Sequence, residues 1–269
     1  MTTDLAGPPT TRPSPLRGGL AATMYREYCL LTRNRTNLLL AVVPSAVYLL
    51  LFATSLANLV GEVHHEGRTV GYAEFTVPAL LLSSMLAAAT TAGTSLFQER
   101  MGRMDVELWS HPLGHGGYVL GKLLVSTLLI LAQSLAALLV SLAVFDFRWP
   151  AAHWAAVLCA TALASLAFNG LYLLLATRFS DFRRFSVTIN VVAPVLLFSS
   201  PSFYPLDRMA PVLQWLSWAN PVTYGIRAVR DGALLGFGGA WPWLLVLAGI
   251  AAVTGPLLGR SLVVRAREL

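Results

Sequence analysis

The sequence predicts an all-α membrane protein with six transmembrane helices, preceded by an amphipathic interfacial helix. Two observations support this fold class. Of 269 residues, 56% are hydrophobic and only 12% are charged, whereas about 25% are charged in a typical soluble domain. In addition, six stretches of 22 residues or more contain no Asp, Glu, Lys or Arg: 36–61, 75–98, 123–145, 149–177, 185–206 and 232–259. About 20 apolar residues in a helix cross a bilayer.

The spans are helices rather than strands of a barrel, because runs such as Leu38–Leu51 do not alternate between apolar and polar residues. We expect a single transmembrane domain over residues 19–269. Its spans are predicted near 38–57, 75–97, 121–145, 153–177, 186–200 and 241–259.

The chain begins with a polar, proline-rich stretch, and we expect residues 1–18 to form a disordered tail. Residues 19–35 follow with apolar residues at positions 21, 24, 25, 28, 31 and 32, and with Arg26 and Arg33 on the opposite face. This spacing predicts an amphipathic helix. Its basic face suits the anionic inner leaflet, so we expect it to lie along the cytoplasmic surface.

The segment before the last span, 201–240, contains a shorter uncharged window over 209–226. The prolines and polar residues within it argue against a seventh span, and Trp215 and Trp218 resemble interfacial anchors. We therefore predict short re-entrant or surface helices on the outer side.

The orientation follows from the distribution of Lys and Arg. With six spans, 14 of the 19 basic residues fall on one side and five on the other. The positive-inside rule then predicts that both termini are cytoplasmic. This topology also accounts for the net charge of +6, so we expect no nucleic-acid partner.

Polar side chains within the predicted spans are few. Gln133, Asn169 and Asn190 either line a transport pathway or form hydrogen bonds between helices. No acidic residue lies in the middle of a predicted span, although ion-gradient-driven carriers usually place ionisable groups there. An ion-driven carrier remains the alternative, but the energy for uphill transport is expected to come from a source other than an ion gradient.

One motif resembles a nucleotide-binding loop. Gly116, Gly121 and Lys122 match G-x-x-x-x-G-K, but Leu123 occupies the position that requires Ser or Thr, and the residues before it are not strand-like. We interpret Lys122 as marking the inner boundary of the third span. No metal site is expected, since Pro112 and Gly114 interrupt the spacing between His111 and His115.

An intramembrane enzyme is a further alternative. Ser141, Ser165 and His153 could act as nucleophile or base, but none has a partner at an informative spacing. We therefore expect a transport subunit and not an enzyme.

The segment between the second and third spans, 98–120, is longer than a simple connection needs and carries both signs of charge. This composition predicts a docking surface for a soluble partner.

The chain resembles the type-2 ATP-binding-cassette exporter permeases over residues 19–269. One part of the resemblance lies in the 98–120 segment. This segment departs from the family in one respect: the stretch from Gly102 to Pro112 is one residue longer than usual. The second, more specific part lies in the outer segment. The matching residues are Glu99, Arg100, Gly102, Asp105, Leu108, Pro112, Gly121 and Lys122, and then Pro205, Pro211, Asn220, Pro221, Thr223, Tyr224 and Arg230.

The resemblance implies a permease of the bacterial inner membrane that exports a hydrophobic or amphiphilic substrate, such as a drug, antibiotic or lipid. Polysaccharide or glycolipid export is the alternative. It also implies two copies of a cytoplasmic ATPase that carry ATP and Mg²⁺, so that no cofactor binds this chain, and a second permease, identical or homologous. The residues expected to couple to the ATPase are Glu99, Arg100, Gly102, Asp105, Glu107 and Pro112.

Overall fold

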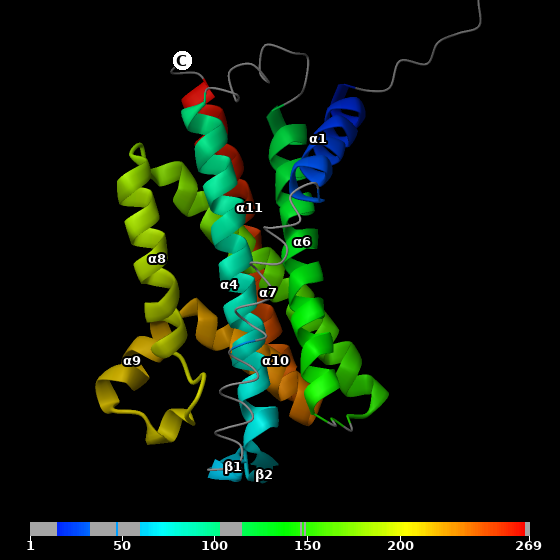
Figure 1. The fold of residues 1–269 in the computed structure, drawn as a ribbon, viewed down its shortest axis with the longest axis vertical. Coiled ribbons are helices and arrows are strands. Elements are labelled where there is room, and N and C mark those ends of the chain that lie inside the picture. Colours follow the sequence, from blue (N-terminus) through cyan, green and yellow to red (C-terminus); the bar gives the residue numbers. More distant parts are fainter. Residues whose placement is uncertain are drawn as a thin grey trace, which may run out of the picture.

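A computed structural model describes residues 15–32, 47, 60–102, 115–145, 147 and 149–266. The described chain is a bundle of long helices with a two-stranded hairpin at one end (Figure 1). Helix α1 and the C-terminal end of α11 lie at the opposite end, which we call the α1 end. We call the other the hairpin end.

Four described helices are long and apolar enough to cross a membrane: α4 (Tyr72–Met101), α6 (His115–Val144), α7 (Ala151–Arg178) and α11 (Phe237–Ala266). They cover the residues predicted as spans near 75–97, 121–145, 153–177 and 241–259. The predicted span at 38–57 lies outside the described residues, apart from Val47.

The predicted fifth span corresponds to α8 (Phe182–Phe198), which has 17 residues and is shorter than the four long helices. It lies at one side of the bundle (Figure 1) and packs on α4 and α10. Its apolar side chains Val187, Val191, Val195 and Phe198 are exposed. Asp181 caps its first turn by accepting a hydrogen bond from the backbone N–H of Arg183, at 2.9 Å.

Helix α1 spans Pro15–Thr32 and packs on α6. It begins four residues before the predicted start at Gly19. Proline is tolerated in the first turn of a helix, because the N–H that it lacks has no partner there. Residues 1–14 and 33–35 lie outside the described residues.

The hairpin formed by β1 (Glu62–His65) and β2 (Arg68–Gly71) was not anticipated from the sequence. His65 pairs with Arg68, which leaves Glu66 and Gly67 as a two-residue turn. Both have positive φ, 46° and 74°, as the tight hairpin turn that matches strand twist requires. Glycine adopts this conformation readily, whereas Glu66 does not.

We call residues 201–240 the outer segment, after the side of the membrane predicted for them. This segment contains three short helical elements: η2 (Leu206–Arg208), α9 (Pro211–Ala219) and α10 (Pro221–Leu235). The predicted window 209–226 is thus divided at Asn220. Helix α10 is largely buried and packs on α4, α7 and α11, whereas most of α9 is exposed.

The long helices pack closely where glycines face a neighbour. A methyl group at Gly170 of α7 would overlap the hydroxyl of Thr254 on α11 and lie 3.1 Å from its Cβ. Thr254 is buried and has little room to move.

Gly170→Ala is therefore expected to destabilise the fold by about 1–3 kcal/mol, as overpacked cores do. Thermal unfolding of the purified permease in detergent measures this. Gly255→Ala on α11 is the matched control, because a methyl group there meets no atom within 4 Å. Equal unfolding temperatures for the two variants would contradict the close packing of α7 on α11.

Candidate functional site

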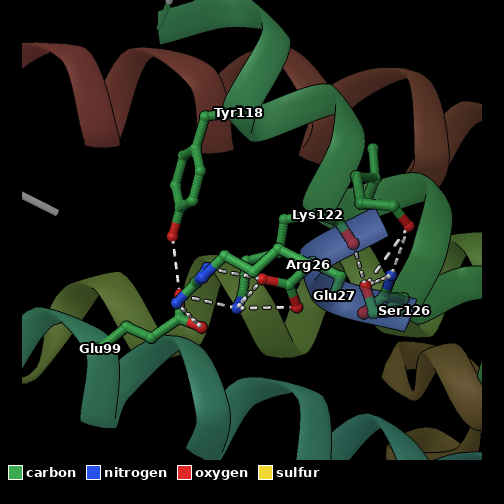
Figure 2. Close-up of polar contacts among 8 residues, drawn as sticks. Arg26, Glu27, Glu99, Tyr118, Lys122 and Ser126 are labelled. Atoms are coloured by element: carbon green, nitrogen blue, oxygen red, sulfur yellow. Dashed lines mark hydrogen bonds and ion pairs between the residues drawn. The ribbon is translucent and has the colours of Figure 1, made fainter. Parts of the chain in front are cut away.

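Charged side chains and one tyrosine hydroxyl, from three helices, meet in the interior near the α1 end (Figure 2). We call this set the buried ion cluster. Its members come from α1, from the last turns of α4 and from the first turns of α6. They are Arg26, Glu27, Glu99, Tyr118 and Lys122.

Lys122 lies between the two carboxylates. Its Nζ is 2.8 Å from Oε2 of Glu99 and 3.3 Å from Oε2 of Glu27. One ammonium group thus joins α6 to both α4 and α1.

Arg26 and Tyr118 complete the contacts of Glu99. Arg26 donates from Nη2 to Oε1 of Glu99 at 3.3 Å, and from Nη1 to Oε1 of Glu27 at 3.0 Å. The Tyr118 hydroxyl donates to Oε2 of Glu99 at 2.8 Å. Tyr118 and Lys122 are four residues apart, so both project from the same face of α6.

The cluster is buried and electrically balanced. Glu27, Glu99 and Lys122 are only 2%, 6% and 3% exposed, whereas Arg26 is partly exposed. When all are ionised, two cations face two carboxylates, which offsets the cost of removing charges from water. Burial raises the pKa of the Glu27 carboxyl; Lys122 and Arg26 oppose this shift, and Glu99 adds to it.

These contacts give a specific location to several residues predicted from the sequence. Glu99, expected on a docking surface, is buried in the cluster. Lys122, expected at the boundary of a span, lies in the second turn of α6 and is paired with carboxylates rather than exposed to water. Gly121 and Lys122 are helical, so they do not form a phosphate-binding loop.

The other predicted coupling residues lie nearby or outside the described chain. Arg100 donates to the carbonyl of Ala176 on α7, at 2.6 Å. Gly102 ends α4, and its N–H donates to the carbonyl of Gln98 at 2.9 Å. Asp105, Glu107 and Pro112 fall outside the described residues.

Glu27 and Tyr118 were not among the site residues predicted from the sequence. Glu27 was one charge among several on an amphipathic helix, and nothing local distinguishes it from a solvated glutamate. The only signal for Tyr118 in the sequence is its i,i+4 spacing from Lys122. This spacing indicates a shared contact only when Glu99 is known to face that side of the helix.

The three polar residues predicted within spans have different environments. Asn169 of α7 is fully buried, and its amide donates to Ser126 at 2.7 Å and to Thr127 at 2.9 Å, both on α6. Gln133 lines a small cavity of about 30 Å³ beside Lys122. Asn190 of α8 is exposed and donates to the carbonyl of Ser186, one turn earlier in the same helix. Asn169 thus joins two helices.

The outer segment is organised around Asn220 and Pro221. Asn220 caps α10 by accepting a hydrogen bond from the N–H of Val222 at 2.9 Å, and it donates to Ser199, at the end of α8, at 3.0 Å. Pro221 and Pro211 occupy the first turns of α10 and α9, and Pro205 precedes η2. The Tyr224 hydroxyl donates to the carbonyl of Trp218.

Arg230 of α10 is 1% exposed and holds the outer segment to the bundle. Its Nε donates to the carbonyl of Phe75 on α4 at 2.9 Å. Its Nη2 donates to the carbonyls of Pro201 at 2.9 Å and Ser202 at 3.3 Å. The guanidinium also lies 3.7 Å from the centroid of the Phe75 ring.

The hairpin is fixed to the same helix. His65 lies 2.9 Å from Oδ1 of Asp231, and the indole N–H of Trp243 donates to Oδ2 at 2.7 Å. Arg68 donates to the carbonyl of Leu234 at 3.0 Å. Helix α10 is therefore a central support of the hairpin end, as the buried ion cluster is of the α1 end.

Comparison with known proteins agrees with this architecture. A family model described as ABC-2 type transporter matches residues 19–234. The chain is 25% identical, over 201 residues, to the inner membrane transport permease YadH of Escherichia coli K12. The match covers 72% of this chain and 73% of that protein, and the same values hold for YadH of E. coli O157:H7 and of Shigella flexneri. The family match confirms the resemblance found in the sequence: the chain belongs to the ABC-2 type transporter family of membrane permeases.

Proposed function

We propose that this chain is the permease subunit of an ATP-driven exporter, and that the buried ion cluster transmits the action of a separate ATPase to the spans. The observation that carries the proposal is the direct connection of α1 to both α4 and α6 through Lys122 and Arg26. Helices joined by buried ion pairs move together, because separating them leaves charges without partners.

The ATPase is proposed to dock at the α1 end, on α1 and the 98–120 segment. ABC-2 permeases normally pair with an ATPase subunit, which supports this partner. Two ATPases, carrying ATP and Mg²⁺, and two permeases would form the complete exporter. In this arrangement the α1 end is cytoplasmic, the hairpin end faces outward, and the membrane is the bacterial inner membrane.

The proposed cargo is hydrophobic or amphiphilic, such as a drug, antibiotic or lipid. The exposed apolar face of α8 and the apolar long helices favour such a substrate over a fully hydrophilic one. The exposed apolar side chains of α8 also suit contact with lipid or with a second permease.

The docking assignment is tested by charge reversal on the 98–120 segment. Because Glu99 is buried, reversing its charge would disturb the fold itself, so the test uses Asp105→Lys combined with Glu107→Lys. The permease is co-expressed with a candidate partner ATPase of the ABC class and reconstituted in liposomes. We expect normal insertion but loss of ATPase co-purification and of stimulated ATP hydrolysis.

Glu62→Lys is the matched control, since Glu62 is an exposed carboxylate of β1 at the hairpin end. It should leave both readouts unchanged. Normal coupling in the Asp105 and Glu107 variant would reject the docking surface. Transport by the permease alone in a proton gradient would reject ATP-driven export in favour of an ion-driven carrier.

A further inference from the structure

A cavity of about 490 Å³ opens at the hairpin end. Four parts of the chain line it: the hairpin turn, the 201–207 segment, Gln214 of α9, and Arg227 and Arg230 of α10. Its volume is within the range of about 300–1,000 Å³ that is typical of small-molecule sites. It lies at the opposite end of the bundle from the buried ion cluster.

Charge is unevenly distributed across this cavity. Its carboxylates, Glu66 and Asp207, belong to exposed residues at its edge, where water screens them. Its two guanidinium groups come from the partly buried Arg227 and the fully buried Arg230, which are less screened. An anion that entered the cavity would therefore experience the cations more strongly than the carboxylates.

Among the described residues, Arg227 is held in position by two aromatic rings and not by hydrogen bonds. Its guanidinium carbon is 4.9 Å from the ring centroid of Trp218 and 4.7 Å from that of Trp243. Such cation–π contacts orient the planar group but leave its N–H groups unoccupied. Within the described part of the chain, no carboxylate forms an ion pair with Arg227 and no group accepts a hydrogen bond from it.

Arg230 contributes a fixed positive charge beside Arg227. Three carbonyl contacts hold its guanidinium, and the neighbouring carboxylate of Asp231 is already bonded to His65 and Trp243. Burial lowers the pKa of Arg230 to about 9, which leaves it charged at neutral pH. A planar donor group with unused N–H groups and an adjacent fixed cation are the elements of a phosphate site.

We propose that this cavity binds a phosphate group, with Arg227 as the residue that contacts it. The cavity is larger than a free phosphate ion requires, which favours the phosphate-bearing headgroup of an amphiphile. Its position on the outer face rests on the proposed topology, whereas binding itself does not depend on transport or on an ATPase.

The test measures equilibrium binding to the full-length permease purified in a maltoside detergent, which contributes no phosphate. The probes are inorganic phosphate, dihexanoyl phosphatidic acid, and uncharged dihexanoylglycerol. Calorimetry gives the affinity, and tryptophan fluorescence reports on Trp218 and Trp243 beside Arg227. We expect both phosphate probes to bind and to change the fluorescence, and dihexanoylglycerol to do neither.

Arg227→Gln is expected to weaken phosphate binding about ten-fold or more, the factor that loss of a charge-assisted hydrogen bond corresponds to. Arg227→Lys keeps the charge but not the planar fork, and should bind with intermediate affinity. Arg208→Gln is the matched control, because Arg208 is exposed in the same outer segment and does not line the cavity. It should bind as the wild type does.

Tighter binding of phosphatidic acid than of inorganic phosphate would identify a lipid headgroup as the ligand, and equal binding a free anion; both support the site. No binding of either probe, or wild-type affinity in folded Arg227→Gln, would overturn the proposal. ATP-driven export that persists without such binding would show that the exporter assignment stands and the phosphate site does not.

Discussion

Replacing Lys122 with methionine is expected to destabilise the permease by about 3–5 kcal/mol, the cost of removing one partner from a buried ion pair. The change leaves the carboxylates of Glu27 and Glu99 facing each other in the interior, with only the partly exposed Arg26 to balance them. Thermal or denaturant unfolding of the purified protein measures the loss.

Two comparisons separate this effect from the loss of a surface charge. Arg260→Met removes an exposed cation from α11 and should change stability by no more than about 0.5 kcal/mol. Adding Glu27→Gln and Glu99→Gln to Lys122→Met removes the unpaired charges and should recover much of the loss. A Lys122→Met protein as stable as the wild type would show that the cluster does not hold α1, α4 and α6 together.

Replacing Arg230 with methionine should cause the second largest loss of stability, lowering the free energy of unfolding by at least about 2 kcal/mol, because three buried carbonyls lose their hydrogen-bond donor. Those carbonyls belong to Phe75, Pro201 and Ser202, so the change releases the 199–204 segment from α4. Hydrogen exchange of the backbone amides in 199–204 should accelerate, and the unfolding temperature should fall.

Arg208→Met is the control, since Arg208 is an exposed arginine of η2, which follows the 199–204 segment. Arg230→Lys keeps a charge but cannot reproduce the fork of donors, so it should recover only part of the stability. If exchange over 199–204 were the same in Arg230→Met and the wild type, Arg230 would not be the residue that holds the outer segment.

The long helices were predictable because their signal is local and large. An uncharged stretch such as 149–177 can pair its backbone hydrogen-bonding groups in a membrane only as a helix. Composition alone therefore locates α7 to within two residues at its start and one at its end. The signal for a helix start at Asn220 and Pro221 is also local, because asparagine is a preferred N-cap and proline is favoured in the first helical turn.

The buried ion cluster was not predictable in the same way. Whether a glutamate faces water or a buried lysine depends on which helices are neighbours, and the sequence around Glu99 and Glu27 is equally compatible with either. The hairpin was missed for a different reason, because Glu66-Gly67 is a weaker turn signal than Asn-Gly or Asp-Gly.

Helix α4 gives the two ends of the molecule a mechanical connection. It is a continuous helix of 30 residues, or about 45 Å at helical rise. Glu99 near its last turn is bonded to α1 and α6, and Phe75 in its first turn accepts a hydrogen bond from Arg230 and lies against its guanidinium. Because α4 is bonded at both ends, we expect a tilt imposed near Glu99 to displace Phe75, and with it the outer segment that Arg230 anchors.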